Sequence, residues 1–172
     1  MSQTAASPSL PTIAFIGGGN MASAIIGGLI HQGHPASQIE VVEPWAEARE
    51  ALRKNYGIEA QAEAGPALQR AQIVVWAVKP QTFRDAAAQA KAHTQGALHL
   101  SVAAGIRSDS IAQWLGTERI VRTMPNTPAL VGKGMSALYA RPAVSAPERQ
   151  SIEAIMATTG EFLWVDSEPQ LD

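Results

Sequence analysis

The feature that most constrains this chain is the stretch of residues 12–30, where a short apolar run meets a glycine-rich turn and then an amphipathic segment. The run IAFI has no polar alternation, which is typical of a parallel strand buried on both faces. Four apolar residues after the turn share helical spacing and predict a helix that lies on a sheet. They are Ala22, Ile25, Ile26 and Leu29. The stretch therefore predicts a strand–turn–helix unit.

The turn itself fits the G-x-G-x-x-A form of the dinucleotide-binding fingerprint through Gly17, Gly19 and Ala22. Gly17 allows the sharp turn, and Gly19 lets backbone approach a pyrophosphate because no Cβ intervenes. The helix N-terminus then offers free N–H groups and a partial positive charge. The alternative is a glycine turn that only joins two packed elements. The strand before it and the helix after it favour the dinucleotide site.

Length and composition exclude several classes of protein. The 172 residues suffice for one domain with a substantial core, and the chain is 46% hydrophobic and 16% charged. A net charge of −2 without blocks of like charge gives no support for nucleic-acid or charged-membrane binding. No apolar run is long enough to span a bilayer. The sequence therefore predicts a soluble protein without nucleic-acid or membrane partners.

Cysteine and histidine usage bears on location and on metals. The chain has no cysteine, so it has no disulfide and no thiolate metal site, which suits a reducing cytoplasm. His31, His34, His93 and His99 are scattered without metal-ligand spacing. We expect them to be solvated or loop residues, and we assign no metal ligands.

Strand and helix patterns alternate along most of the chain. Strands are expected at residues 39–43, 58–60, 73–78, 97–103, 119–124, 135–140 and 161–165, and helices at 45–56, 66–70, 80–93, 108–115 and 147–158. Gly33 and Gly57 are expected to end helices in the left-handed conformation, and Ser108 to cap one. This rhythm predicts a Rossmann-like, doubly wound α/β fold, with a mainly parallel sheet and helices on both faces.

The two ends of the chain differ from this pattern. Residues 1–11 are rich in Ser, Ala and Pro and predict a flexible leader rather than a signal peptide. Residues 12–166 are expected to form a dinucleotide-binding domain. Residues 167–172 are polar and show no closing element, so we expect them to begin a linker.

Four sequence blocks resemble the pyrroline-5-carboxylate reductase family, in its order and at its spacing. They are FIGGGNM at residues 15–21, AVKP at 77–80, SVAAG at 101–105 and VRTMPNTPALVGKGM at 121–135. The resemblance covers essentially the whole chain from residue 12 onward. It implies reduction of the small molecule 1-pyrroline-5-carboxylate to L-proline in proline biosynthesis, by hydride transfer from NAD(P)H to a cyclic imine.

The resemblance also implies a cofactor site at the carboxyl ends of the strands. The loop at Gly17 would bind pyrophosphate, residues 78–80 and 103–104 would line the ribose and nicotinamide, and the backbone near Asn126 would hold the nicotinamide. The cofactor-binding candidates are Gly17, Gly18, Gly19, Asn20, Met21, Glu43, Ala77, Val78, Lys79, Pro80, Ala103, Ala104 and Asn126. Each has a structural alternative, such as Pro80 as the first residue of a helix, Lys79 as a solvated lysine, or Asn126 in a local turn.

Glu43 bears on the choice between NADH and NADPH. It ends the second expected strand, where a carboxylate accepts hydrogen bonds from a ribose hydroxyl and repels a 2′-phosphate. Many family members instead carry a small polar residue with a nearby arginine, whereas here the first arginine is Arg49, a turn into the next helix. The sequence slightly favours NADH.

Full-length family members continue into a helical domain that forms the dimer and much of the substrate pocket. This chain is therefore expected to be the cofactor domain alone, monomeric as a fragment of a homo-oligomer and poorly active, and we assign no catalytic residue. Rival interpretations are another Rossmann enzyme, of the hydroxy-acid, prephenate or deazaflavin-dependent type, and a non-catalytic nucleotide-binding module.

Overall fold

The computed structural model describes residues 10–124 and 134–171, which form one seven-stranded sheet with the order β2-β1-β3-β4-β5-β6-β7. The strands are β1 Ile13–Ile16, β2 Ile39–Val42, β3 Ile73–Trp76, β4 Leu98–Ser101, β5 Ile120–Met124, β6 Gly134–Ala140 and β7 Gly160–Trp164. The first five pair in parallel, β6 runs antiparallel to β5, and β7 is parallel to β6. The predicted mainly parallel sheet is confirmed.

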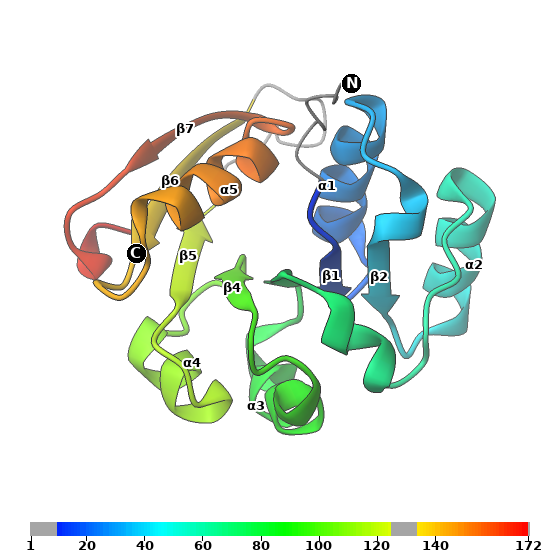
Figure 1. Cartoon of the computed structure of the whole chain (residues 1–172), viewed down its shortest axis with the longest axis horizontal. Helices are drawn as coiled ribbons and strands as arrows, with labels where there is room; N and C mark the ends of the chain where they lie inside the picture. The colour runs from blue at the N-terminus through cyan, green and yellow to red at the C-terminus, as the bar shows by residue number, and fades with distance from the viewer. Residues whose placement is uncertain (1–9, 125–133, 172) are drawn as a thin grey trace, which may run out of the picture.

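Helices cover both faces of the sheet, as the doubly wound prediction required. They are α1 Asn20–His31, α2 Ala46–Tyr56, α3 Pro80–Ala90, α4 Ser108–Leu115 and α5 Ala146–Met156, with short 3₁₀ turns at Ala36–Gln38, Pro66–Arg70, Lys91–His93 and Glu168–Leu171. Figure 1 shows α1 and α5 on one side of the sheet and α3 and α4 on the other. No helix among the described residues is long and apolar enough to cross a bilayer.

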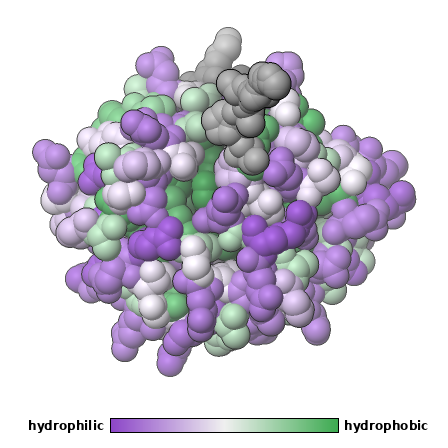
Figure 2. Space-filling view, viewed as in Figure 1, coloured by the Kyte–Doolittle hydropathy of each residue, from purple (hydrophilic) through white to green (hydrophobic). Residues whose placement is uncertain are grey.

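The uninterrupted apolar strands are explained by two hydrophobic cores. Ile13 and Phe15 point into the core that α1, α2 and α5 cover, whereas Ala14 and Ile16 point into the core under α3 and α4. All four residues of β1 are buried. Figure 2 shows apolar residues in the middle of one face, between the α1 and α5 sides of the molecule, with polar side chains around them.

The order of the strands reverses at β1. From β1 the chain passes through α1 to β2 on one side, and through α2 it reaches β3 on the other side. At the carboxyl ends of β1 and β3, the loops that follow these two strands therefore lead to opposite faces of the sheet. Such a switch point is where open α/β sheets bind ligands.

The strand expected at residues 58–60 is not formed. A single parallel bridge joins Val42 to Gln61, whose backbone N–H donates to the Val41 oxygen at 2.8 Å. Ile58 is instead buried in the core beside α2. The segment then runs through several alanines to Gly65 and Pro66, so it lacks the β-branched residues that sustain a strand.

The end of the chain differs most from its prediction. A 3₁₀ turn, Glu168–Leu171, packs on β6 and buries Leu171, so the segment expected to lack a closing element has one. The Glu168 carboxylate accepts hydrogen bonds from the Ser108 N–H at 2.5 Å and hydroxyl at 2.7 Å, and from Arg122 Nη1 at 2.9 Å. These contacts lower the pKa of Glu168 despite the opposing effect of burial. Ser108 is thus the first residue of α4 and not its cap, which is Arg107.

Two of the four histidines are buried, and His99, in a strand, contradicts the prediction of solvated or loop residues, whereas His34 lies in a loop as expected. His99 lies in β4 with 1% exposure, and its Nδ1 accepts a hydrogen bond from Trp76 Nε1 at 3.0 Å. His34 is buried after α1. Of the expected leader, residues 1–9 lie outside the described residues. The Leu10 carbonyl accepts a hydrogen bond from Gln38 Nε2 at 2.7 Å.

Candidate functional site

The glycine turn joins β1 to α1 at the switch point. Gly17 has φ +102° and its N–H donates to the Val42 oxygen at 2.8 Å, which places the turn beside the end of β2. A Cβ at Gly17 would lie 2.4 Å from the Ala77 oxygen, so the turn also touches the loop after β3. Gly19 precedes α1 as its N-cap residue, and no side chain caps the helix. The first-turn N–H groups therefore remain available to an anion.

Glu43 fastens the glycine turn to the entry of α2. Its Oε1 accepts a hydrogen bond from the Gly18 N–H at 2.7 Å, and its Oε2 accepts one from the Trp45 N–H at 2.8 Å. Nη1 of Arg49 donates to the backbone oxygens of Glu43 and Pro44. The loop after β2 is thus held from two directions, and the carboxylate lies against the turn.

A pocket of about 550 Å³ opens between the three loops that follow β1, β2 and β3. It brings together six of the thirteen predicted cofactor residues: Gly17, Gly19, Glu43, Ala77, Val78 and Lys79. These positions are spread over more than 60 residues of sequence. The structure therefore gathers one wall of the predicted site from three separate loops.

The other predicted residues do not line this pocket. Gly18 is buried behind Glu43, Pro80 is the first residue of α3, and Ala103 is buried after β4. Asn20, Met21 and the exposed Ala104 also lie outside the lining, and Asn126 lies outside the described residues. Their roles toward a cofactor stay predictions.

Several lining residues were not predicted from the sequence. Pro44, Trp45, Ala62 and Ala64 come from the β2 side, and Thr82, Asp85, Ala86 and Gln89 from α3. Those of α3 recur one helical turn apart after Pro80, a spacing that could have identified them. The loop residues carry no periodic signal, because their position depends on how residues 61–65 run beside β2.

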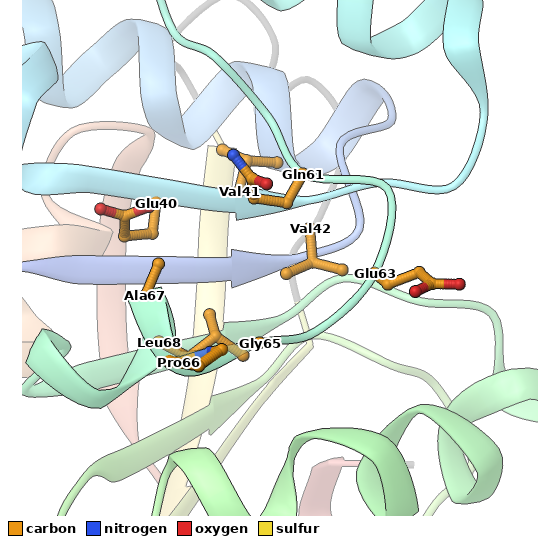
Figure 3. A pocket seen from close by; sticks show the side chains of 9 residues that line it. All are labelled: Glu40, Val41, Val42, Gln61, Glu63, Gly65, Pro66, Ala67 and Leu68. Atoms are coloured by element: carbon orange, nitrogen blue, oxygen red, sulfur yellow. The ribbon is translucent and has the colours of Figure 1, made fainter.

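A second, smaller pocket of about 110 Å³ lies at the edge of β2 (Figure 3). The labelled side chains come from β2 and from residues 61–68, and the Glu40 carboxylate accepts a hydrogen bond from Arg70 Nε at 2.6 Å. This pocket is well below the roughly 300–1,000 Å³ of typical ligand sites. The larger pocket is the better candidate site.

The larger pocket fits a dinucleotide in three respects. A Cβ built on Gly19 would meet no atom within 4 Å, so backbone there faces open space. Uncapped N–H groups of α1 lie next to it, and the exposed Lys79 supplies a cation at the opposite loop. Apolar residues form most of the remaining wall, as in many cofactor sites.

Comparison with known families agrees with this geometry. Residues 12–105, more than half of the chain, match the family described as NADP oxidoreductase, coenzyme F420-dependent. The chain belongs to this family. The matched region contains β1, the glycine turn, Glu43 and the loops after β3 and β4.

Within this NADP oxidoreductase family, the chain is similar to pyrroline-5-carboxylate reductases. The protein of that name from Pseudomonas aeruginosa is 43% identical over 166 residues, which are 95% of this chain and 61% of that protein. The one from Haemophilus influenzae is 40% identical over 161 residues, which are 92% of this chain and 59% of that protein. A solved pyrroline-5-carboxylate reductase from Coxiella burnetii has a TM-score of 0.89 at 33% identity, covering 95% of this chain and 62% of that one. The chain thus spans about 60% of the length of these relatives.

Proposed function

We propose that this chain is the cofactor-binding part of an enzyme that reduces 1-pyrroline-5-carboxylate to L-proline with NAD(P)H. The observation that carries the proposal is the 43% identity to the Pseudomonas aeruginosa reductase, which extends over 95% of this chain. The family description alone is compatible with a deazaflavin-dependent reductase, but it matches only residues 12–105. The likeness to pyrroline-5-carboxylate reductases continues beyond them, which favours the imine reductase.

In the proposed reaction a hydride passes from the reduced nicotinamide to the imine carbon, and the nitrogen gains a proton. The bound cofactor supplies the hydride, and the protein supplies position and electrostatics. Residues 12–166 would form the dinucleotide-binding domain. The turn at Gly17 and Gly19, with the α1 N-terminus, would hold the pyrophosphate, while Lys79 offsets its negative charge. A cytoplasmic location and a homo-oligomeric whole protein stay predictions.

The experiment that tests this function compares two proteins. One is the 172-residue chain, and the other joins it to the portion of the Pseudomonas aeruginosa reductase that the match leaves uncovered. We expect both to bind NADH. We expect the joined protein to reduce 1-pyrroline-5-carboxylate with a kcat/KM at least about 100-fold above that of the chain alone, because substrate must be held against the nicotinamide.

The readout is loss of NADH absorbance together with proline formation. A joined protein that is folded and binds NADH, yet forms no proline, would contradict the proposed substrate. Reduction of hydroxy-acid, prephenate or deazaflavin partners instead would assign the site to one of the rival enzymes. Cofactor binding without turnover of any of them would indicate a nucleotide-binding module.

We further propose that the site prefers NADH to NADPH. The Glu43 carboxylate lies at the end of β2, where it would face the adenosine ribose and repel a 2′-phosphate. Arg49, the first arginine after Glu43, is engaged with the backbone oxygens of Glu43 and Pro44. Arg49 lines a separate surface pocket with Glu50 and Arg53, so it does not face the candidate site.

Calorimetric titrations at fixed ionic strength are expected to show NADH binding about 10-fold more tightly than NADPH. Glu43→Gln removes the charge and keeps an oxygen acceptor for one of the two N–H groups. It should bring the two affinities within about 3-fold of each other. Glu43→Ala should weaken both cofactors, because the Gly18 and Trp45 N–H groups then lose their acceptors.

Glu63→Gln is the matched control, since Glu63 is an exposed carboxylate that lines the small pocket and not the candidate site. Its cofactor preference should equal that of the unaltered chain. Tighter binding of NADPH by the unaltered chain would leave the site in place and remove this role from Glu43.

A further inference from the structure

Trp45 is the most exposed large hydrophobic residue among those described, with 63% of its surface accessible. A single exposed apolar side chain is ordinary by itself. Trp45, however, lines the candidate pocket next to Glu43. An indole at the mouth of a ligand-sized pocket offers a flat apolar face to whatever binds there.

The backbone of Trp45 is held although its side chain is free. Its N–H donates to Glu43 Oε2 at 2.8 Å, and its carbonyl oxygen accepts from the Arg49 N–H at 3.1 Å as α2 begins. Pro44 before it fixes its own φ, and the Pro44 oxygen accepts from Arg49 Nη1 at 2.7 Å. The indole is therefore carried on a rigid support, which lowers the entropy lost when a ring packs against it.

The rest of the pocket suits the edges of a planar heterocycle. Ala62, Ala64 and Val78 provide apolar wall, and Ala86 continues it on α3. Three polar side chains of α3 stand along the same lining and can donate or accept hydrogen bonds. They are Thr82, Asp85 and Gln89. An apolar slot with a few polar groups at its edge is the usual composition of a base-binding site.

The strand order decides which half of a dinucleotide would lie here. The glycine turn after β1 marks the pyrophosphate, β2 lies on one side of it, and β3 and β4 lie on the other. Trp45 follows β2, on the side where a carboxylate ordinarily binds the adenosine ribose. The nicotinamide half would extend the other way, toward β4.

We propose that Trp45 is a stacking platform for the adenine ring of the cofactor, with its indole face against the purine. The inference rests on the proposed function only in requiring that the pocket binds a dinucleotide. It assigns the base contact to a residue outside the glycine fingerprint, and it makes the exposed indole a determinant of purine affinity.

The test uses ADP, which carries the adenosine and pyrophosphate but no nicotinamide. Trp45→Ala should weaken ADP and NADH alike by about 10-fold, whereas Trp45→Phe, which keeps a ring, should stay within about 3-fold of the unaltered chain. Affinity for nicotinamide mononucleotide should not change. Leu163→Ala removes a similarly exposed apolar side chain on β7, away from the pocket, and should alter none of these affinities.

Fluorescence supplies a readout that would not change if Trp45 had only a structural role. Saturating ADP should quench the emission of the unaltered chain, and the quenching should disappear in Trp45→Phe, because the other three tryptophans do not line the pocket. Equal ADP affinity in the unaltered chain and Trp45→Ala would overturn the proposal, as would failure of the unaltered chain to bind ADP. A joined enzyme that forms no proline, while ADP binding still depends on Trp45, would overturn the proposed substrate and leave the platform standing.

Discussion

Gly17→Ala is expected to eliminate measurable NADH binding and to lower the free energy of unfolding by about 3 kcal/mol. Gly17 has φ +102°, and a Cβ there would lie 2.4 Å from the Ala77 oxygen and 2.9 Å from its carbonyl carbon. These are backbone atoms, so no rotation of a side chain can relieve the overlap. The loop after β3 would have to move away from the turn, and the wall of the pocket would move with it. Urea unfolding and calorimetric titration with NADH measure the two effects.

Gly19→Ala is the matched comparison, because the two glycines differ in what a methyl group would meet. Gly19 has φ −80°, and a Cβ there would contact nothing within 4 Å. The free energy of unfolding of the Gly19→Ala variant should therefore stay within about 0.5 kcal/mol of that of the unaltered chain. The added methyl would occupy the space in which the pyrophosphate is proposed to lie, so NADH affinity should fall at least about 10-fold. If Gly17→Ala kept full stability and NADH binding, the assignment of this turn would be wrong.

The parts of the fold that local sequence determines were predictable. The β1 strand, the glycine turn and α1 follow from apolar spacing and backbone freedom, and α1 ends at His31 with Gly33 at φ +96°. The α2 helix ends at Tyr56 and is followed by the left-handed Gly57, also as predicted. In each case the signal and the structure that it specifies lie within a few residues of one another.

The features that depend on distant partners were not predictable from local pattern. Serine is a residue type that often caps helices, but Glu168, 60 residues away in the sequence, accepts hydrogen bonds from both the N–H and the hydroxyl of Ser108. A histidine is expected at the surface, yet His99 is buried, and the Trp76 side chain in the neighbouring strand donates a hydrogen bond to it. Tertiary partners of this kind override local preference, since a polar group is tolerated in a core once it is hydrogen-bonded.

The candidate site divides in the same way. Gly17, Gly19 and Glu43 could be placed at one pocket because strand ends beside a switch point border the same crevice, whatever their side chains are. Trp45 could not, because its place in the lining depends on the direction in which the loop after β2 presents it. A fingerprint thus locates the backbone of the candidate pocket more readily than the side chains that complete its lining.

Acid should weaken the fold through the buried His99 before carboxylate protonation does. Burial, and secondarily the charge of Arg119, lowers the pKa of His99 from 6.5 to about 4. Between pH 6.5 and about pH 4, His99 is therefore protonated in the unfolded chain and neutral in the folded chain. The stability that depends on neutral His99 is present above pH 6.5 and is lost as the pH falls toward 4. The total loss is about 3 kcal/mol, of which about 2 kcal/mol falls between pH 7 and pH 5.

Urea unfolding at a series of pH values and constant ionic strength measures this loss. Glu148 and Glu168 also have lowered pKa values. Their contributions to the free energy of unfolding are lost only as the pH falls below 4.5, the ordinary pKa of a glutamate. His99→Gln leaves a neutral acceptor within reach of Trp76 Nε1 and should flatten the curve between pH 7 and pH 5, even if it lowers stability at pH 7. His31→Gln, at an exposed histidine, should leave the slope unchanged. A His99→Gln curve as steep as that of the unaltered chain would show that the proton is taken up elsewhere, because only a group whose pKa differs between the two states can couple unfolding to pH.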